Sequence, residues 1–298
     1  MGERWTDLLD PDADQVRARV PVELYDAAVA QLTAPSAETR PTIENHGPYI
    51  LGVLIAPAII AELDLLYYQE IDFILTEDSL LTVRKSPPGK APFDISDTRR
   101  AQRSGEAISM QAYKLVDSVA ARYLEQIDEL NSEIDELEDN VEIWSPERVR
   151  VRLSDLRHDV SRLRRTLGPT RDAVHRIVSG RLDAEGKALF PREVELHFAD
   201  VYDKLLEASE MLELSRDLVA SARDYHQAQI AHDQNEVMKR LTILTALFLF
   251  PTFVVGVYGQ NFRHLPELPW RLGYAWSWFL ILAWWLVLWL YMRRKRWI

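Results

Sequence analysis

Amide and hydroxyl groups recur at regular spacing along an otherwise apolar stretch near the end of the chain. The residues concerned are three or four positions apart, so a helix would place them on one face: Asn235, Met238, Leu241 or Thr242, Thr245, Leu249, Thr252 and Gly256. Asparagine and threonine oxygens accept hydrogen bonds from the water shell of a cation without removing that shell. Such a stripe could line a narrow path for a hydrated ion, with Met238 and Leu241 as apolar constrictions that gate by dewetting. The same two residues could instead face lipid or pack against another helix.

Four residues that suit the mouth of such a path follow directly: Tyr258, Gly259, Gln260 and Asn261. Gly259 lets backbone carbonyls approach closely, and Asn261 offers an amide oxygen. Taken alone, however, the same residues are also an ordinary helix stop, because glycine and asparagine tolerate left-handed backbone geometry. Both interpretations stay open on this motif alone.

Two uncharged runs, 241–257 and 275–292, predict two membrane-spanning helices joined by a short turn. Each is about the length needed to cross a hydrocarbon core of roughly 30 Å at about 1.5 Å per residue. Lys239 and Arg240 precede the first run, and an inner basic cluster follows the second: Arg293, Arg294, Lys295 and Arg296. By the positive-inside rule, we expect both termini in the cytoplasm and a multi-pass protein of the cell membrane.

Composition excludes several classes of function. The net charge of −11 argues against nucleic acid as a partner, since phosphates need a basic surface. A chain with no cysteine has no disulfide framework and no thiolate metal site. The first 14 residues lack the apolar segment of a signal peptide.

The chain divides by composition into three predicted parts: a cytoplasmic α/β domain at 1–105, a helical hairpin with a stalk helix at 106–240, and a two-helix transmembrane pore domain at 241–298. The first part predicts a helix around residues 21–32 and strands at 49–55, 70–75 and 80–85. The last two strands form a hairpin across residues 76–79. Residues 86–103 are rich in proline, glycine and charge and predict a linker or surface loop.

Long helices with coiled-coil spacing follow. An apolar stripe from Ile127 to Val141 and another from Val149 to Leu167 are separated by Ser145 and Pro146, which cap and start a helix. Residues 123–144 hold nine acids and no Lys or Arg, whereas 147–176 hold nine arginines and four acids. This predicts an antiparallel hairpin with complementary faces. A third helix is expected from near Pro191 to about residue 258, on the order of 100 Å long.

Several motifs in order resemble the CorA family of metal-ion transporters, whose hallmark is Tyr-Gly-Met-Asn-Phe at the outer end of the first span. The chain has Tyr-Gly-Gln-Asn-Phe at 258–262, preceded by Asn-Glu-Val-Met-Lys-Arg-Leu-Thr at 235–242 and Pro-Thr-Phe at 251–253. Leu-Pro-Glu-Leu at 265–268 fills the outer loop and includes Glu267. The resemblance extends upstream through Asp-Val-Tyr-Asp at 200–203, the acidic hairpin and the strands at 71–84. It implies a homopentameric funnel embedded in the bilayer, with five first-span helices around a pore for hydrated divalent cations, chiefly Mg²⁺.

The resemblance also implies roles for individual residues. Tyr258, Gly259, Gln260 and Asn261 would form the selectivity mouth. Asp200 matches the stalk aspartate that holds a regulatory Mg²⁺ together with an acid of a neighbouring subunit. The stretch matching that partner, residues 31–35, has no acid, and Gln260 replaces the family's methionine.

Three other functions remain in competition. A transporter for zinc or a broad set of divalent cations, including Co²⁺ and Ni²⁺, would use the same scaffold. A membrane-tethered coiled-coil scaffold would conduct nothing. An enzyme is disfavoured, since the nearest phosphate-loop pattern, between Gly180 and Ala188, has the wrong spacing and lacks the hydroxyl residue. We expect no cofactor, only the transported cation, and no partner beyond other copies of the chain and the bilayer.

Overall fold

The computed structural model describes residues 4–295, except 37–38, 61–64, 102, 104, 183–188 and 261–269. The chain forms two compact units, residues 1–223 and 224–298, which are described separately below. The division expected at residues 105 and 240 stays a prediction.

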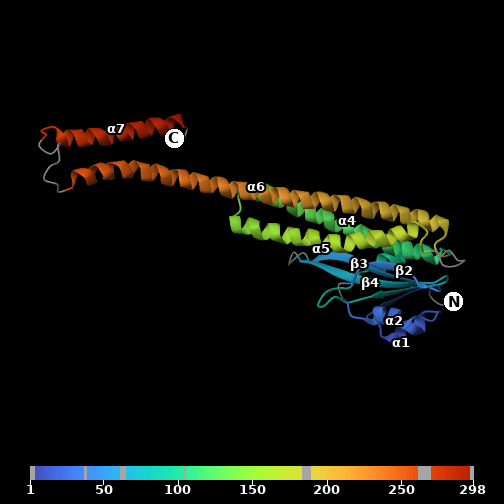
Figure 1. The fold of residues 1–298 in the computed structure, drawn as a ribbon. Helices are drawn as coiled ribbons and strands as arrows, with labels where there is room; N and C mark the ends of the chain where they lie inside the picture. Colours follow the sequence, from blue (N-terminus) through green and yellow to red (C-terminus); the bar gives the residue numbers. More distant parts are fainter. Residues whose placement is uncertain are drawn as a thin grey trace. The chain divides into compact units, whose positions relative to one another are not determined.

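A five-stranded sheet forms the centre of the first unit (Figure 1). Its spatial order is β1-β5-β4-β3-β2, with β1 parallel to β5 and every other pair antiparallel. The strands are β1 (Trp5–Leu9), β2 (Thr42–Asn45), β3 (Ile50–Ile60), β4 (Leu65–Leu75) and β5 (Leu80–Arg84). The hairpin across residues 76–79 is confirmed, since Leu75 pairs with Leu80 and the Thr76 N–H donates to the Ser79 carbonyl at 2.9 Å.

Strands β3 and β4 are longer than the sequence predicts. Residues 56–60 pair with 65–69, a stretch that contains Pro57, and proline weakens a strand prediction because it cannot donate to the ladder. The helix expected at 21–32 is also corrected, because α2 (Asp26–Thr33) begins later. The Tyr25 N–H donates to the Tyr49 hydroxyl at 3.2 Å, which holds Tyr25 in extended geometry as the N-cap.

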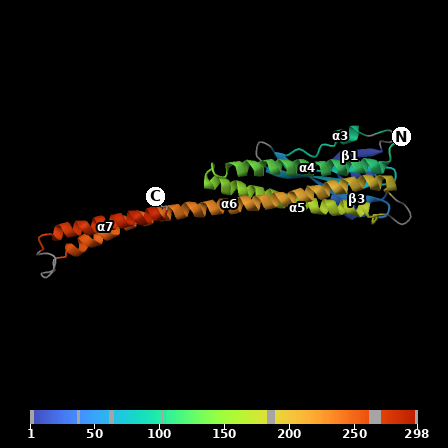
Figure 2. The same cartoon turned by 90° about the horizontal axis from the view of Figure 1, so that it is seen from above.

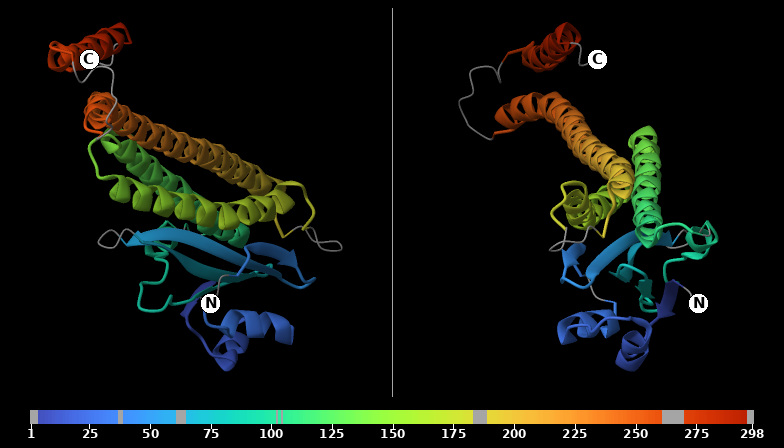
Figure 3. Two further views of the ribbon diagram at one scale, coloured as in Figure 1. Left: turned by 60° about the vertical axis from the view of Figure 1, so that its left-hand side comes forward. Right: turned by 90° about the vertical axis from the view of Figure 1, so that its right-hand side faces the viewer.

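Helices cover both faces of the sheet (Figure 3). α1 (Ala13–Arg19) and α2 pack on one face, where Val16, Val29 and Leu32 meet Ile74 and Leu81. The opposite face carries Ile71 and Phe73, which join the larger core formed with the long helices. The alternation along β4 thus produces two separate cores.

Three long helices form the second layer: α4 (Ile108–Asn140), α5 (Pro146–Val178) and the first part of α6 (Arg192–Tyr258) (Figure 2). The hairpin between α4 and α5 is confirmed, and so is its start signal, because the Ser145 side chain accepts from the Arg148 N–H. The predicted seam is buried except at Val141, which is partly buried, and Ile134, Leu137 and Leu156 have 0% exposure. Complementary charge contributes an ion pair across the hairpin, from Arg152 to Glu133 at 3.2 Å.

The start of α4 and the loop before it differ from expectation. α4 begins 19 residues before the predicted stripe at Ile127, because its first half packs Leu115, Val119 and Tyr123 against the sheet as well as other helices. The predicted linker at 86–103 holds a short helix, α3 (Ser96–Arg100).

A buried ammonium group lies between the sheet and α2. The Lys85 Nζ donates to Glu70 Oε1 at 2.7 Å and to the Gln31 carbonyl at 2.8 Å, and it lies 2.8 Å from Asp72 Oδ2. The side chains of Lys85, Glu70 and Asp72 are all at most 2% exposed. Burial raises the pKa of Asp72 to about 7, against the lowering effect of Lys85. Burial by itself lowers the pKa of Lys85, but the two carboxylates outweigh it and the net pKa is raised.

The second unit consists of the last part of α6 and α7 (Gly273–Arg294), which lies beside α6 and runs the opposite way (Figure 1). Both helices are long and apolar enough to cross a membrane, as predicted for 241–257 and 275–292. α6 is one helix of 67 residues that includes Pro251. The predicted third helix from near Pro191 to residue 258 is therefore confirmed.

Candidate functional site

The α6–α7 pair leaves one polar-lined face of α6 uncovered. All the stripe residues of α6 predicted from the sequence are exposed: Asn235, Met238, Leu241, Thr242, Thr245, Leu249, Thr252 and Gly256. The residues of α6 that are less exposed or buried, among them Ala246, Phe250 and Val254, lie on average about 120° around the helix from the centre of the stripe, at about 100° per residue. Because α7 packs on that side, the stripe has no partner within the described part of the unit.

Two threonines of the stripe have their hydroxyl protons engaged with the helix backbone. Thr242 donates to the Met238 carbonyl at 2.8 Å, and Thr245 donates to the Leu241 carbonyl at 2.9 Å. A hydroxyl that donates in this way keeps its oxygen lone pairs as acceptors. These lone pairs can accept hydrogen bonds from water, including the water bound to a cation.

The α7-facing side of α6 is fixed by two neighbouring tryptophans of α7. Trp284 Nε1 donates to the Ala246 carbonyl at 3.0 Å, and Trp285 Nε1 donates to the Leu247 carbonyl at 3.1 Å. The Trp284 ring also stacks on Phe250, with centroids 4.8 Å apart. Neither contact could be predicted from spacing within α6. Pro251, four residues after Leu247, is a signal for the contact of Trp285 only, because it leaves the Leu247 carbonyl without a helical donor.

The predicted mouth is partly described. Tyr258 ends α6, and Gly259 and Gln260 are exposed beyond it. A Cβ at Gly259 would lie 3.0 Å from the Val255 carbonyl oxygen, a close approach that glycine relieves. Asn261 and the outer-loop Glu267 lie outside the described residues.

Basic residues gather at one end of the α6–α7 pair. Arg293, Arg294 and Lys295 are exposed at the end of α7, while Arg296 lies outside the described residues. The hydrogen bond of Trp284 pairs residue 284 of α7 with residue 246 of α6. Because the two helices run in opposite directions, Arg293, nine residues after 284, lies beside the segment about nine residues before 246, which contains Lys239. Both predicted cationic groups therefore lie at the same end of the pair.

Asp200, the candidate regulatory residue, is exposed on α6 in the first unit. One turn further on, Lys204 Nζ contacts Asp117 Oδ1 of α4 at 2.6 Å. The hydrogen bond to Asp117 raises the pKa of Lys204, and Asp200 adds to that effect. An ammonium group thus already lies near Asp200. Within the ranges that the structure describes, no three His, Asp or Glu side chains converge to hold a metal ion.

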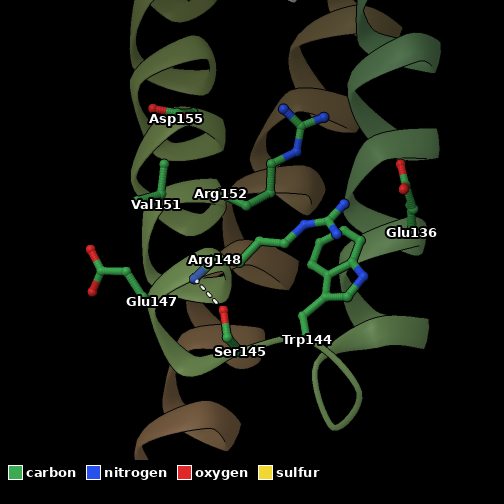
Figure 4. Close-up of a pocket in the computed structure, with 8 residues that line it drawn as sticks. All are labelled: Glu136, Trp144, Ser145, Glu147, Arg148, Val151, Arg152 and Asp155. Atoms are coloured by element: carbon green, nitrogen blue, oxygen red, sulfur yellow. Dashed lines mark hydrogen bonds between the residues drawn. The ribbon is translucent and has the colours of Figure 1, made fainter.

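A hollow of about 570 Å³ lies at the tip of the α4–α5 hairpin (Figure 4). It is lined by Glu136, Trp144, Ser145, Glu147, Arg148, Val151, Arg152 and Asp155. The Arg148 guanidinium lies over the Trp144 ring at 3.8 Å. The stacked Arg148–Trp144 pair and the Ser145 cap both order the end of the hairpin, and this structural role explains why these side chains gather there.

Comparison with known proteins agrees with this architecture. The family model described as CorA-like Mg²⁺ transporter protein matches residues 4–294. The cobalt/magnesium transport protein CorA of Thermotoga maritima is 29% identical over 264 residues, which cover 87% of this chain and 73% of that protein.

Two solved structures share the fold. The complete structure of the CorA magnesium transporter from Methanocaldococcus jannaschii has a TM-score of 0.80 at 21% identity, covering 99% of this chain and 91% of that chain. The full-length CmaX protein has a TM-score of 0.75 at 22% identity, covering 98% and 88%. The α/β domain, the long helix and the two C-terminal apolar helices are common to all three chains, and the family match spans nearly the whole sequence. The chain therefore belongs to the CorA-like Mg²⁺ transporter family of divalent-cation transporters.

Proposed function

We propose that copies of this chain enclose a membrane pore with the exposed stripe of α6, and that hydrated Mg²⁺ passes through it. The observation that carries the proposal is the stripe itself, since α7 covers another side of α6 and, among the described residues of the second unit, no other helix contacts the threonines. If the stripe faced lipid, these hydroxyl oxygens would have no hydrogen-bond donor. If several copies placed the stripe around a shared axis, the same oxygens would face water. Family resemblance supports five copies.

The chemistry of the stripe suits an ion that keeps its water. Mg²⁺ dehydrates reluctantly and usually retains several waters in proteins. Thr242 and Thr245 offer lone pairs that accept hydrogen bonds from such a water shell, and neither carries a charge that would trap the ion. A path that binds weakly at several positions permits conduction.

The driving force in this proposal is the membrane potential. Between Arg240 and Arg263 the sequence has no ionisable residue except Tyr258, so the first span lacks the carboxylate or histidine that proton-coupled carriers keep within the membrane. Each charge gains roughly 2.3 kcal/mol per 100 mV, so a divalent cation moving inward gains about 4.6 kcal/mol.

Orientation follows from the basic end of the α6–α7 pair. Lys239, Arg240 and the cluster after α7 belong on the cytoplasmic side by the positive-inside rule. Both termini are then cytoplasmic, and the exposed Gln260 lies at the outer mouth. Gln260 supplies an amide where the family's hallmark has methionine, so its side chain bears directly on which ion is preferred.

Metal uptake into liposomes tests this function. We expect purified protein to carry Mg²⁺, and Thr245→Val to reduce that flux because it removes the hydroxyl while keeping the side-chain volume. Leu244→Val is the matched control, since Leu244 is 54% exposed and lies about 120° around the helix from the centre of the stripe.

Parallel assays with Zn²⁺, Co²⁺ and Ni²⁺ separate the alternatives. Flux of Zn²⁺ without Mg²⁺ would assign the chain to zinc transport. Absence of flux for all four metals would refute conduction and leave the non-conducting scaffold.

A further inference from the structure

Pro251 interrupts the hydrogen bonding of α6 in the middle of the first span. Proline has no N–H, so the carbonyl four residues earlier, that of Leu247, has no helical donor. Hydrocarbon offers no water to replace it, and an unsatisfied backbone group there costs several kcal/mol. The helix nevertheless continues through Pro251 to Tyr258.

Trp285 of α7 supplies the missing donor. Its Nε1–H lies 3.1 Å from the Leu247 carbonyl oxygen. The preceding tryptophan makes a similar bond of 3.0 Å to the Ala246 carbonyl, but there Phe250 retains the backbone N–H that an α-helix uses. Two neighbouring indoles thus make the same type of contact, and only that of Trp285 satisfies a group that proline has left unpaired.

The position of this bond matters because the stripe lies on both sides of the proline. Thr245 and Leu249 precede Pro251, whereas Thr252 and Gly256 follow it. A proline removes one backbone bond and permits a kink. The direction of the helix after Pro251 therefore determines whether the two halves of the stripe stay aligned.

We infer that Trp285 is a positioning residue: its indole N–H holds the Leu247 carbonyl released by Pro251 and thereby sets the bend of α6 and the alignment of the stripe. The inference rests on the proposed function for its consequence in transport. The contact itself is independent of that function, and the two can be tested separately.

A double-mutant cycle tests the contact. Pro251→Ala restores the backbone N–H, so the Leu247 carbonyl no longer needs the indole. Trp285→Phe removes the donor and keeps a ring. The chain has no cysteine, so Val254→Cys, at a position 5% exposed on the α7-facing side of α6, provides a single thiol that reports opening of the pair.

In the Val254→Cys protein, we expect Trp285→Phe to increase the rate of labelling by a small maleimide about tenfold, the effect of losing one interhelical bond of about 1–2 kcal/mol. When the same protein also carries Pro251→Ala, Trp285→Phe should change the labelling rate less than twofold. Trp284→Phe is the matched control, and its effect should be the same with and without Pro251→Ala.

Flux supplies the second readout. Misalignment of the stripe should change the ratio of Mg²⁺ to Co²⁺ flux in Trp285→Phe, and Pro251→Ala should remove that change. Simple loss of folded protein would lower both fluxes in proportion. An equal labelling increase for Trp285→Phe in both backgrounds would overturn the inference, as would a flux ratio unchanged from the parent protein. A labelling cycle that behaves as expected in a protein that carries no metal would support the contact and refute the proposed function.

Discussion

Removing the buried ammonium group by Lys85→Met should open the sheet of the first unit. Lys85 Nζ lies 2.7–2.8 Å from oxygens of Glu70, Asp72 and Gln31, and neither carboxylate is more than 1% exposed. Loss of one partner from a buried ion pair costs about 3–5 kcal/mol, because the remaining charge stays buried without compensation. At about 1.4 kcal/mol per factor of ten, the opening equilibrium rises by a factor of roughly 10² to 4 × 10³ at pH 8.

The pH dependence of this loss has a definite sign. The pKa of Asp72 is already raised by burial to about 7, and removal of Lys85 takes away the charge that lowers it. A folded-state pKa above the unfolded value near 3.9 means that the folded state holds the proton more tightly. The stabilisation from that proton is complete below the unfolded pKa and is lost as pH rises through the folded pKa. The penalty of Lys85→Met should therefore shrink by up to about 1.4 kcal/mol per pH unit on acidification from the further raised pKa of Asp72 in the variant down to about pH 7, below which Asp72 is protonated in both folded proteins and its contribution to the penalty is constant.

Hydrogen exchange of β4 and β5 peptides measures this opening in the intact protein, with each variant compared to the parent at the same pH. The control combines Lys85→Met with Glu70→Gln and Asp72→Asn, which removes all three charges and should restore most of the protection. Parent-like exchange in Lys85→Met alone at pH 8 would refute the reasoning. So would a penalty that grows as the pH is lowered.

Two further substitutions test packing and capping. Gly52→Ala would place a Cβ 2.0 Å from the Phe73 ring, so we expect the substitution to destabilise the fold by about 1–3 kcal/mol. Thermal or chemical unfolding measures this loss, and Phe73→Leu should partly rescue it. An unchanged unfolding midpoint would contradict this packing. Ser145→Ala should cost about 1 kcal/mol, measured as faster hydrogen exchange in the first turn of α5, because it removes the acceptor for the Arg148 N–H. The exposed Ser154→Ala, in the interior of α5, should leave that turn unaffected, and equal effects of the two serine variants would argue against a specific cap.

The parts of the fold that depend on local signals were predictable. Ser145 followed by Pro146 marks a helix start because one side chain caps the turn and the other residue needs no N–H. β1 was missed because its parallel pairing with β5 joins residues more than 70 positions apart, and Asp7 in its centre weakens the strand pattern. The far end of β3 was missed because Pro57 cannot donate to the ladder, which weakens the strand pattern there.

The site was predictable only as far as one helix face defines it. The stripe on α6 follows from spacing alone, and the structure leaves that face uncovered, while its role in lining a path for ions stays a prediction. The contact of Trp285 with Leu247 depends on how α7 lies against α6, which no pattern within one helix specifies. The Lys85 cluster was likewise hidden, because charged residues two apart on a strand usually indicate a solvent-exposed face rather than a buried ion pair.

A pore of this kind requires that the stripe face water across the bilayer, and single thiols can measure this in a chain that has no cysteine of its own. Thr245→Cys and Thr252→Cys, reconstituted in liposomes, should react with a small, charged, water-soluble thiol reagent, and the reaction should block Mg²⁺ flux. Leu244→Cys, exposed on the helix about 120° from the centre of the stripe, should resist the reagent. Equal protection of all three thiols, or modification of Thr245→Cys that leaves flux unchanged, would contradict a water-filled path along this face.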